Sequence, residues 1–287
     1  MFRTQSSSLL SSSLLAAAAA VSLFALGACA PATDDGEQVA DSAWLAPVLA
    51  GDQRSDDERA RDQYRNPAET LAFFGLQPDS TVVEIWPGGG WYTKVIAPAV
   101  NEQGQFYAAH FDPDSEIPML RKALAKYQGL LDSRPELYGK VQMTVLQPPA
   151  KTEIAPAGSA DLVVSFRSVH NWMAFGMQDQ VMTAIFDALK PGGVFGVVEH
   201  RGPAGTEQDP KAKSGYVTEA YMIELAERAG FVLDAKSEVN ANPADTKDWP
   251  EGVWTLPPRL KLGEQDREKY LAVGESDRFT LRFVKPQ

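Results

Sequence analysis

Cysteine is nearly absent from the sequence, and positive charge is in short supply. Cys29 is the single cysteine among 287 residues, so no disulfide can form within the chain, which excludes small scaffolds held together by disulfides. Lysine and arginine number 27 against 38 aspartates and glutamates, for a formal net charge of −11. A protein that binds a nucleic-acid duplex needs a basic face to displace the counterions of the phosphates. We therefore expect small-molecule ligands and no nucleic acid as a partner.

One long apolar stretch is present, at residues 1–28, where Arg3 is the sole charge. Serines interrupt it too often for a membrane span, and the pattern predicts an export signal peptide. It ends in Leu-Gly-Ala-Cys29, which resembles the lipobox of bacterial lipoproteins. The resemblance implies that Cys29 is acylated and that the protein is anchored in a membrane of the cell envelope, facing the periplasm. Cleavage at the A-x-A pattern of residues 28–30, which would remove Cys29, stays open as the alternative.

Residues 29–43 are rich in proline, threonine, aspartate and glycine and predict a disordered tether. From residue 44 to residue 287, strand-like and helix-like runs alternate, which is typical of a sheet covered by helices on both faces. We predict one α/β domain with a doubly wound, mostly parallel, seven-stranded sheet. The expected strands span residues 81–86, 105–110, 141–146, 161–166, 194–199, 231–237 and 279–284.

The connection between the last two expected strands covers residues 238–277, which is much longer than the usual connection in a compact domain. It contains Trp249 and Trp254 among several prolines. A disordered loop would not carry two tryptophans among so many stiff residues. We therefore expect an ordered insertion here that acts as a lid or a small subdomain.

A glycine-rich turn follows the first expected strand, with the sequence E-I-W-P-G-G-G-W-Y-T from Glu84 to Thr93. Glycine has no Cβ atom, so a ligand can approach the backbone closely at such a turn. The dinucleotide-binding pattern G-x-G-x-x-G is not met, because Trp86 stands in place of its first glycine. A pyrophosphate-bearing cofactor is therefore disfavoured, and the acid at Glu84 suits a cationic ligand instead.

This turn resembles the first motif of the class I S-adenosylmethionine-dependent methyltransferases, in which an acid closes strand one and a loop G-x-G-x-G follows. Glu84 matches the acid, Gly88 and Gly90 match the second and third glycines, and Trp86 departs from the first. The resemblance implies a Rossmann-like methyltransferase fold with an insertion between the last two strands.

Other segments extend the resemblance over roughly residues 44–287. The strand A-D-L-V-V-S-F from residue 160 and the turn L-K-P-G-G from residue 189 are similar to features of the same family. The segments F-R-S-V-H-N-W at 166–172, V-E-H-R at 198–201 and D-W-P-E-G-V-W-T-L-P-P at 248–258 resemble a group of uncharacterised bacterial methyltransferases.

The resemblance implies that S-adenosyl-L-methionine is the cofactor and that Glu84 contacts its methionine end. The expected loop beneath the cofactor consists of Trp86, Pro87, Gly88, Gly89 and Gly90. In the family, an acid closing strand two grips the ribose; here His110 holds that place, and Asp112, two residues on, supplies the usual carboxylate. Gln147, after strand three, is expected to meet the adenine edge.

The three histidines of the chain, His110, His170 and His200, close the second, fourth and fifth expected strands. The carboxyl ends of such strands form the ligand crevice of a doubly wound sheet. His170 is our candidate for the catalytic base, because the resemblance places the methyl acceptor at the turn after strand four. His200 is a second candidate. A zinc site built from the three stays open, but no H-x-x-x-H or C-x-x-C spacing supports it and we assign no metal.

Two functions follow from the sequence. The first is S-adenosylmethionine-dependent methyl transfer to a small-molecule or lipid acceptor, favoured by Glu84, Gly88, Gly90 and His170. The second is a catalytically silent ligand-binding module at the envelope, favoured by the export signal and by Trp86.

The proposed lipid anchor gives a direct test. When the protein is expressed with its own signal, we expect it to fractionate with membranes, because acyl chains on Cys29 hold it there. The variant Cys29→Ser should stay unprocessed or change its fractionation. Mass spectrometry of the mature N-terminus checks this, and an unmodified N-terminus at Pro31 would decide for ordinary cleavage.

Overall fold

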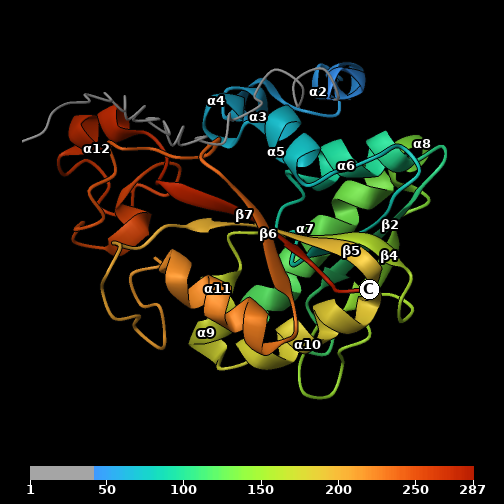
Figure 1. The fold of residues 1–287 in the computed structure, drawn as a ribbon. Coiled ribbons are helices and arrows are strands. Elements are labelled where there is room, and N and C mark those ends of the chain that lie inside the picture. Colours follow the sequence, from blue (N-terminus) through green and yellow to red (C-terminus); the bar gives the residue numbers. More distant parts are fainter. Residues whose placement is uncertain (1–41) are drawn as a thin grey trace, which may run out of the picture. The chain divides into compact units, whose positions relative to one another are not determined.

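A seven-stranded sheet runs through the centre of the described chain, which is residues 42–287 of a computed structural model (Figure 1). The predicted signal peptide, Cys29 and most of the predicted tether lie outside the described residues. The strands are β1 (Thr81–Ile85), β2 (Gln105–His110), β3 (Gln142–Val145), β4 (Ala160–Phe166), β5 (Leu189–His200), β6 (Val232–Ser237) and β7 (Arg278–Val284). Their spatial order is β3-β2-β1-β4-β5-β7-β6, so the α/β fold and the seven expected strands are confirmed.

The sheet is mixed, whereas the sequence predicted a mostly parallel one. Strands β3, β2, β1, β4 and β5 pair in parallel, and β7 pairs antiparallel with both β5 and β6. A parallel neighbour requires a crossover that returns the chain to the opposite edge of the sheet. Residues 238–277 instead bring the chain back at the edge where β6 ends, so β7 runs the other way.

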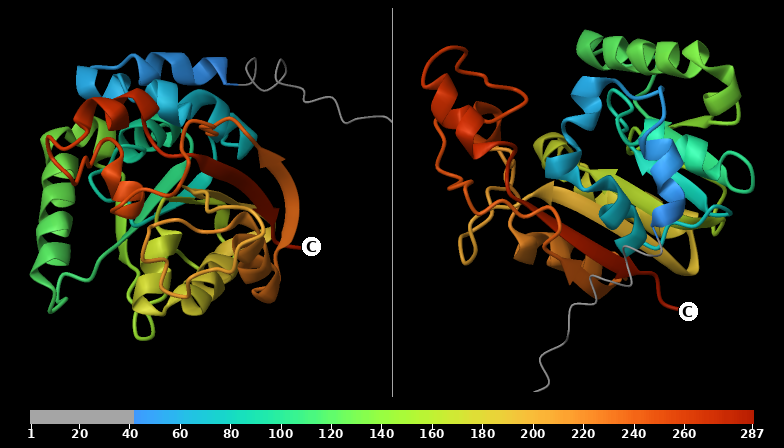
Figure 2. Two further views of the ribbon diagram at one scale, coloured as in Figure 1. Left: turned by 90° about the vertical axis from the view of Figure 1, so that its left-hand side faces the viewer. Right: turned by 90° about the horizontal axis from the view of Figure 1, so that it is seen from above.

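Helices cover both faces of the sheet (Figures 1 and 2). One layer contains α5 (Pro67–Phe73), α6 (Thr93–Val100), α7 (Pro118–Ser133) and α8 (Pro135–Tyr138). The other contains α9 (Val169–Phe175), α10 (Gln178–Ala188) and α11 (Glu219–Arg228). Short N-terminal elements precede them: η1 (Ala43–Leu45), α2 (Ala46–Leu49), α3 (Asp56–Arg59) and α4 (Asp62–Arg65). Between β6 and β7 lie η2 (Gly252–Thr255) and α12 (Arg267–Val273).

The central strand β1 shows why its sequence is apolar almost throughout. Val82 packs into the hydrophobic cluster that contains residues of α5 and α6. Val83 and Ile85 point to the opposite face and join the cluster that contains residues of α9 and α10. Successive side chains of a strand alternate between faces, and here both faces are covered, so both sets are buried.

Two helices begin in different ways. Thr218 caps α11, because its hydroxyl oxygen accepts a hydrogen bond from the backbone N–H of Tyr221. Asn66 does precede α5, but its backbone is left-handed (φ 38°) and its side chain makes no capping hydrogen bond. Its amide nitrogen donates instead to the carbonyl of Val239 at 2.6 Å. Tertiary contact with the segment after β6 has replaced the local cap.

Asp245, which is buried, joins parts of residues 238–277 to one another and to Tyr216. Its carboxylate accepts hydrogen bonds from the hydroxyl of Tyr216, from Nε1 of Trp249 at 2.7 Å and from the backbone N–H of Asp277. These contacts give the segment an ordered structure without a long helix. Within residues 42–287, no helix has both the length and the apolar character that a membrane crossing requires.

The contact between β5 and α5 yields a stability prediction. A Cβ atom added at Gly196 would lie 2.5 Å from the ring of Phe74, so Gly196→Ala should lower the free energy of unfolding by about 1–3 kcal/mol through overpacking. At Gly129, exposed in α7, an added Cβ meets nothing within 4 Å, and Gly129→Ala should stabilise by roughly 0.5–1 kcal/mol. Urea unfolding measures both, and wild-type stability in Gly196→Ala would contradict this packing.

Candidate functional site

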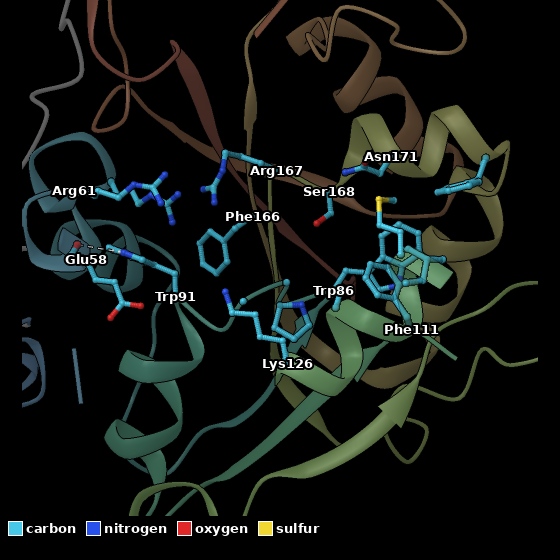
Figure 3. Close-up of a pocket in the computed structure, with 18 residues that line it drawn as sticks. Glu58, Arg61, Trp86, Trp91, Phe111, Lys126, Phe166, Arg167, Ser168 and Asn171 are labelled. Atoms are coloured by element: carbon cyan, nitrogen blue, oxygen red, sulfur yellow. Dashed lines mark hydrogen bonds between the residues drawn. The ribbon is translucent and has the colours of Figure 1, made fainter. Parts of the chain in front are cut away.

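A cavity of about 590 Å³ lies at the carboxyl ends of β1, β2 and β4, where the strand order reverses (Figure 3). This is the usual place for a ligand crevice in a doubly wound sheet. From the sheet edge it is lined by Trp86, Pro87, Gly88, Gly89, Phe111, Phe166, Arg167 and Ser168. The helices and their connections contribute Glu58, Arg61, Arg65, Trp91, Met119, Leu120, Ala123, Lys126, Asn171 and Phe175.

The glycine loop after β1 divides into two parts. Gly88 (φ +59°) and Gly89 line the cavity, and an added Cβ at either would meet no atom within 4 Å. Their backbone is therefore open to a ligand. At Gly90 (φ +80°), an added Cβ would lie 2.3 Å from the side chain of Leu130 in α7. Gly90 thus serves close packing and does not line the cavity.

Trp86 stands at the first-glycine position with a left-handed backbone (φ 45°), a conformation that costs a bulky residue strain. Its Nε1–H donates to the carbonyl of Leu146, just after β3, at 3.2 Å. Its ring lies 5.0 Å from that of Phe111 and 6.4 Å from that of Phe175. These three rings form an aromatic wall at one end of the cavity, and Figure 3 labels two of them, Trp86 and Phe111.

Glu84 lies behind the loop rather than along the cavity. Its carboxylate is 2% exposed and accepts a 2.6 Å hydrogen bond from the hydroxyl of Thr93, the first residue of α6. Burial raises the pKa of Glu84 to about 7. The hydroxyls of Thr93 and Tyr127 are 3.0 Å apart, which extends the chain of polar contacts to α7. Glu84 therefore ties β1 to the helices on either side of the loop.

The other predicted cofactor residues are spread out. The backbone N–H of Phe111 donates to Nδ1 of His110, so Nε2–H of His110 is the donor to the carbonyl of Gly88 at 3.3 Å. Burial lowers the pKa of His110 to about 4, so it holds the loop as a neutral ring. Asp112 is paired with Lys151 at 2.8 Å, and Gln147 exchanges backbone hydrogen bonds with Lys151. None of His110, Asp112 and Gln147 lines the cavity.

His170 lies at the start of α9 and connects a buried carboxylate to the cavity. Glu199, fully buried at the end of β5, accepts hydrogen bonds from the backbone N–H groups of His170 and His200. It also lies 3.1 Å from Nδ1 of His170, which therefore carries the proton. Nε2 of His170 then accepts from the amide nitrogen of Asn171 at 3.1 Å, and Asn171 lines the cavity. The carboxylate orients the ring and makes Nε2 the basic atom.

His200 lies beside this pair, with its ring 5.4 Å from that of His170 and its Nδ1 2.6 Å from the hydroxyl of Ser276. Burial and the neighbouring His170 lower the pKa of His200 well below its usual value. Trp254, from η2, lies 6.2 Å from the ring of His170, so residues 238–277 contribute contacts to both histidines.

Polar atoms of His170, Glu199 and His200 lie within 4.8 Å of one another, but His110 is not part of the group. The three-histidine zinc site considered from the sequence is therefore not formed. Hydrogen bonds within the group already account for Nδ1 of His170 and for the Glu199 carboxylate, and Nδ1 of His200 is bonded to Ser276.

The opposite end of the cavity is cationic, which the sequence analysis missed. Arg61 and Arg65 flank α4, and Arg167 follows β4; all three line the cavity. Figure 3 shows the guanidinium of Arg167 directed toward Arg61. The four-residue spacing of Arg61 and Arg65 in a charge-rich stretch was a usable sign of a common helix face. Nothing in the sequence linked that face to Arg167.

Comparison by sequence returned nothing: no protein-family model matches the chain, and no curated protein matches it. Comparison with solved structures did find matches. A methyltransferase from Aquifex aeolicus, described as S-adenosylmethionine-dependent, superimposes with a TM-score of 0.53 at 14% identity, covering 85% of this chain and 98% of that one. The fold is that of S-adenosylmethionine-dependent methyltransferases.

Two further structures support the same methyltransferase fold. The [4+2]-cyclase SpnF gives a TM-score of 0.53 at 15% identity, covering 85% of this chain and 93% of that chain. Phosphoethanolamine N-methyltransferase 2 of Haemonchus contortus, in complex with S-adenosyl-L-methionine, gives 0.52 at 17% identity, covering 88% of this chain and 59% of that one. At such identities the likeness shows the fold alone, and the cyclase shows that the fold is not limited to one reaction.

The raised pKa of Glu84 predicts a pH-dependent stability difference. Between pH 4.5 and about 7 the folded state binds more protons at Glu84 than the unfolded state, so this residue's contribution to the free energy of unfolding falls as pH rises. Glu84→Gln keeps an acceptor for Thr93 and removes the titration. Its stability relative to wild type should therefore rise with pH, by on the order of 3 kcal/mol over that window.

Thermal or urea unfolding from pH 4.5 to 8 measures this difference, with Glu102→Gln at an exposed position as the matched control. A constant offset between Glu84→Gln and wild type across the range would contradict the assignment.

Proposed function

We propose that the protein transfers a methyl group from S-adenosyl-L-methionine to a small-molecule or lipid acceptor bound in the 590 Å³ cavity. The observation that carries the proposal is the hydrogen-bonded chain from Glu199 through His170 to Asn171. This chain ends at the same cavity as the open backbone of Gly88 and Gly89. The basic Nε2 of His170 is therefore separated by one side chain, Asn171, from the cavity that the ligand-accepting loop lines.

The cavity residues fit the cofactor at two places. The backbone of Gly88 and Gly89 is free of steric obstruction, and the aromatic wall of Trp86, Phe111 and Phe175 offers ring faces for a flat heterocycle. The volume lies within the usual range for sites that bind ligands of this size. The sequence predicted that Gln147 would meet the adenine edge of the cofactor. Instead, the indole of Trp86 occupies the space beside Leu146, the residue before Gln147. We therefore assign cofactor binding to the loop and the aromatic wall.

When bound, S-adenosylmethionine supplies an electrophilic methyl group on a sulfonium. The protein's part is to hold the acceptor and to take its proton. Rotation of the Asn171 side chain uncovers Nε2 of His170, which receives the proton that the acceptor loses as its new bond to carbon forms. The Glu199 carboxylate stabilises the imidazolium through Nδ1–H, and neutral His200 adds no competing charge. Residues 238–277 exclude water from the histidines as a lid.

We also propose, from the sequence, that Cys29 anchors the protein in an envelope membrane, so that the acceptor is a molecule of that compartment. Residues 29–43 would then be the tether and residues 44–287 the catalytic domain.

A second function is favoured by one observation. Trp86 fills part of the cofactor side of the crevice, and Asp112, the expected ribose ligand, is paired with Lys151 outside the cavity. This arrangement suits a catalytically silent module that binds another ligand. Calorimetry with S-adenosylmethionine separates the two functions, because the silent module need not bind it.

Substitution of His170 tests the mechanism. With labelled S-adenosylmethionine and an envelope extract as the source of acceptor, His170→Ala should lose about a hundredfold to ten-thousandfold in turnover, because the proton acceptor is removed. Its affinity for the cofactor, measured by calorimetry, should stay within twofold of wild type, since His170 does not line the cavity. Glu199→Gln should give a smaller loss and a shifted pH profile, because only the orienting charge is removed.

Melting temperatures of each variant confirm that the fold is intact. Full turnover in His170→Ala would disprove its role as the base. Cofactor binding by wild type without methylation of any component of the extract would favour the silent module.

A further inference from the structure

The cationic end of the cavity carries more positive charge than the protein neutralises. Four guanidinium groups gather there, from Arg61, Arg65, Arg167 and Arg278. Burial, and after it repulsion from the neighbouring guanidinium groups, lowers the pKa of Arg65 and of Arg167. Glu275 is the carboxylate that faces them: it pairs with Arg278, with Arg61 at 2.5 Å and with Arg65 at 3.6 Å. Four positive charges thus share one ion-paired carboxylate. Glu84, which also interacts with Arg167, has its pKa raised to about 7 by burial, so positive charge stays in local excess.

The other acid on this wall, Glu58, does not reduce the surplus. Both of its carboxylate oxygens accept hydrogen bonds from Nζ of Lys94, at 2.7 and 2.9 Å. Lys126, from α7, lines the cavity and adds a further cation. Tyr92, which contacts the backbone carbonyl of Arg65, has its pKa raised by burial and stays neutral.

Two of the arginines that line the cavity have unused hydrogen-bonding capacity. Arg65 is 4% exposed, and its Nε has no hydrogen-bond partner; its guanidinium lies 4.6 Å from the ring centroid of Trp91. Arg167 makes no side-chain hydrogen bond or ion pair with any residue in 42–287. Its backbone is left-handed, at φ 57°. Both side chains line the cavity.

Buried charges without partners are costly, and a cluster of like charges is more so. Arg278 donates to the carbonyl of Tyr64 and to Glu275, although its Nε, like that of Arg65, has no hydrogen-bond partner. Arg278 does not line the cavity, whereas Arg65 and Arg167 do. Guanidinium groups bind phosphate and carboxylate oxygens through paired N–H donors, and an excess of positive charge favours a dianion over a monoanion.

We propose that Arg61, Arg65 and Arg167 form a subsite for a phosphoryl group, and that this group belongs to the methyl acceptor. The subsite itself stands on the contacts above, whereas its assignment to a methyl acceptor rests on the proposed function. In Figure 3, Arg61 lies at one side of the view and Asn171 at the other, with Phe166 and Ser168 between them. An acceptor held by its phosphoryl group at the arginines would extend its nucleophilic atom toward Asn171 and His170.

Calorimetric titration of the full-length protein with inorganic phosphate and pyrophosphate, in low-salt buffer without other multivalent anions, tests the subsite. Both should bind, and Arg167→Gln should weaken binding at least tenfold, as expected for loss of a charge-assisted hydrogen bond. Arg121→Gln, on α7 outside the cavity, is the matched control and should bind as wild type does. Equal phosphate affinity in Arg167→Gln and wild type, or no binding by wild type, would overturn the proposal.

Thermal unfolding provides an independent readout. Because Arg167 is an uncompensated charge, Arg167→Gln should melt at or above the wild-type temperature without phosphate, and phosphate should raise the melting temperature of wild type only. If Arg167→Gln fails to fold, Arg167→Lys takes its place; it keeps the charge, loses the paired donors and should bind phosphate more weakly. A variant that melts well below wild type without phosphate would mean that Arg167 is a structural residue, contrary to the proposal.

Two further titrations assign the anion to its source. Phosphate should bind equally well when S-adenosylmethionine is saturating, if the subsite serves the acceptor. 5′-Methylthioadenosine resembles the cofactor but lacks its carboxylate. If S-adenosylmethionine competes with phosphate and 5′-methylthioadenosine does not, the arginines bind the cofactor, and the acceptor assignment is overturned. Arginine-dependent phosphate binding without any binding of S-adenosylmethionine would leave the subsite standing while the proposed function fails.

Discussion

The carboxylate of Glu275 is the contact on which the cavity depends. It is 2% exposed and joins Arg61 and Arg65, at the N-terminal helix α4, to Arg278, the first residue of β7. These partners are more than 200 positions apart in the sequence. The three positive charges hold the pKa of Glu275 down at about 2, despite burial. One shared anion therefore fixes the N-terminal helices against the C-terminal segment.

The second centre, at the histidines, follows from the same return of the chain. Residues 238–277 end at Ser276 and Asp277, so the segment that supplies Glu275 to the arginines also supplies Ser276 to His200. Trp254, earlier in it, packs beside His170. The cationic end and the histidine pair are thus both built on one connection, and a movement of that connection would alter both together. This gives a physical reason for its order and for the unusual length that the sequence already showed.

The sequence predicted what depends on local pattern. Both faces of the sheet are covered, so each strand is apolar enough to identify, and Thr218 caps α11 because its partner is three residues away. The direction of β7 and the contacts of Asn66 depend on residues far along the chain, and no local signal reports them. The same holds for the site. The loop at Gly88 was found because glycine is locally informative, whereas Arg167 acquires its setting only when α4 and β4 meet.

The net charge illustrates the difference between composition and site. A chain with a formal charge of −11 should repel anions at long range, and this charge argued against nucleic acid as a partner. In physiological salt, however, exposed charges are screened beyond about 8 Å, whereas buried charges are screened much less. The arginines around Glu275 are partly or fully buried, so their surplus governs what binds in the cavity. The acidic surface then acts on the rate at which an anionic ligand arrives, and the cavity acts on how tightly it is held.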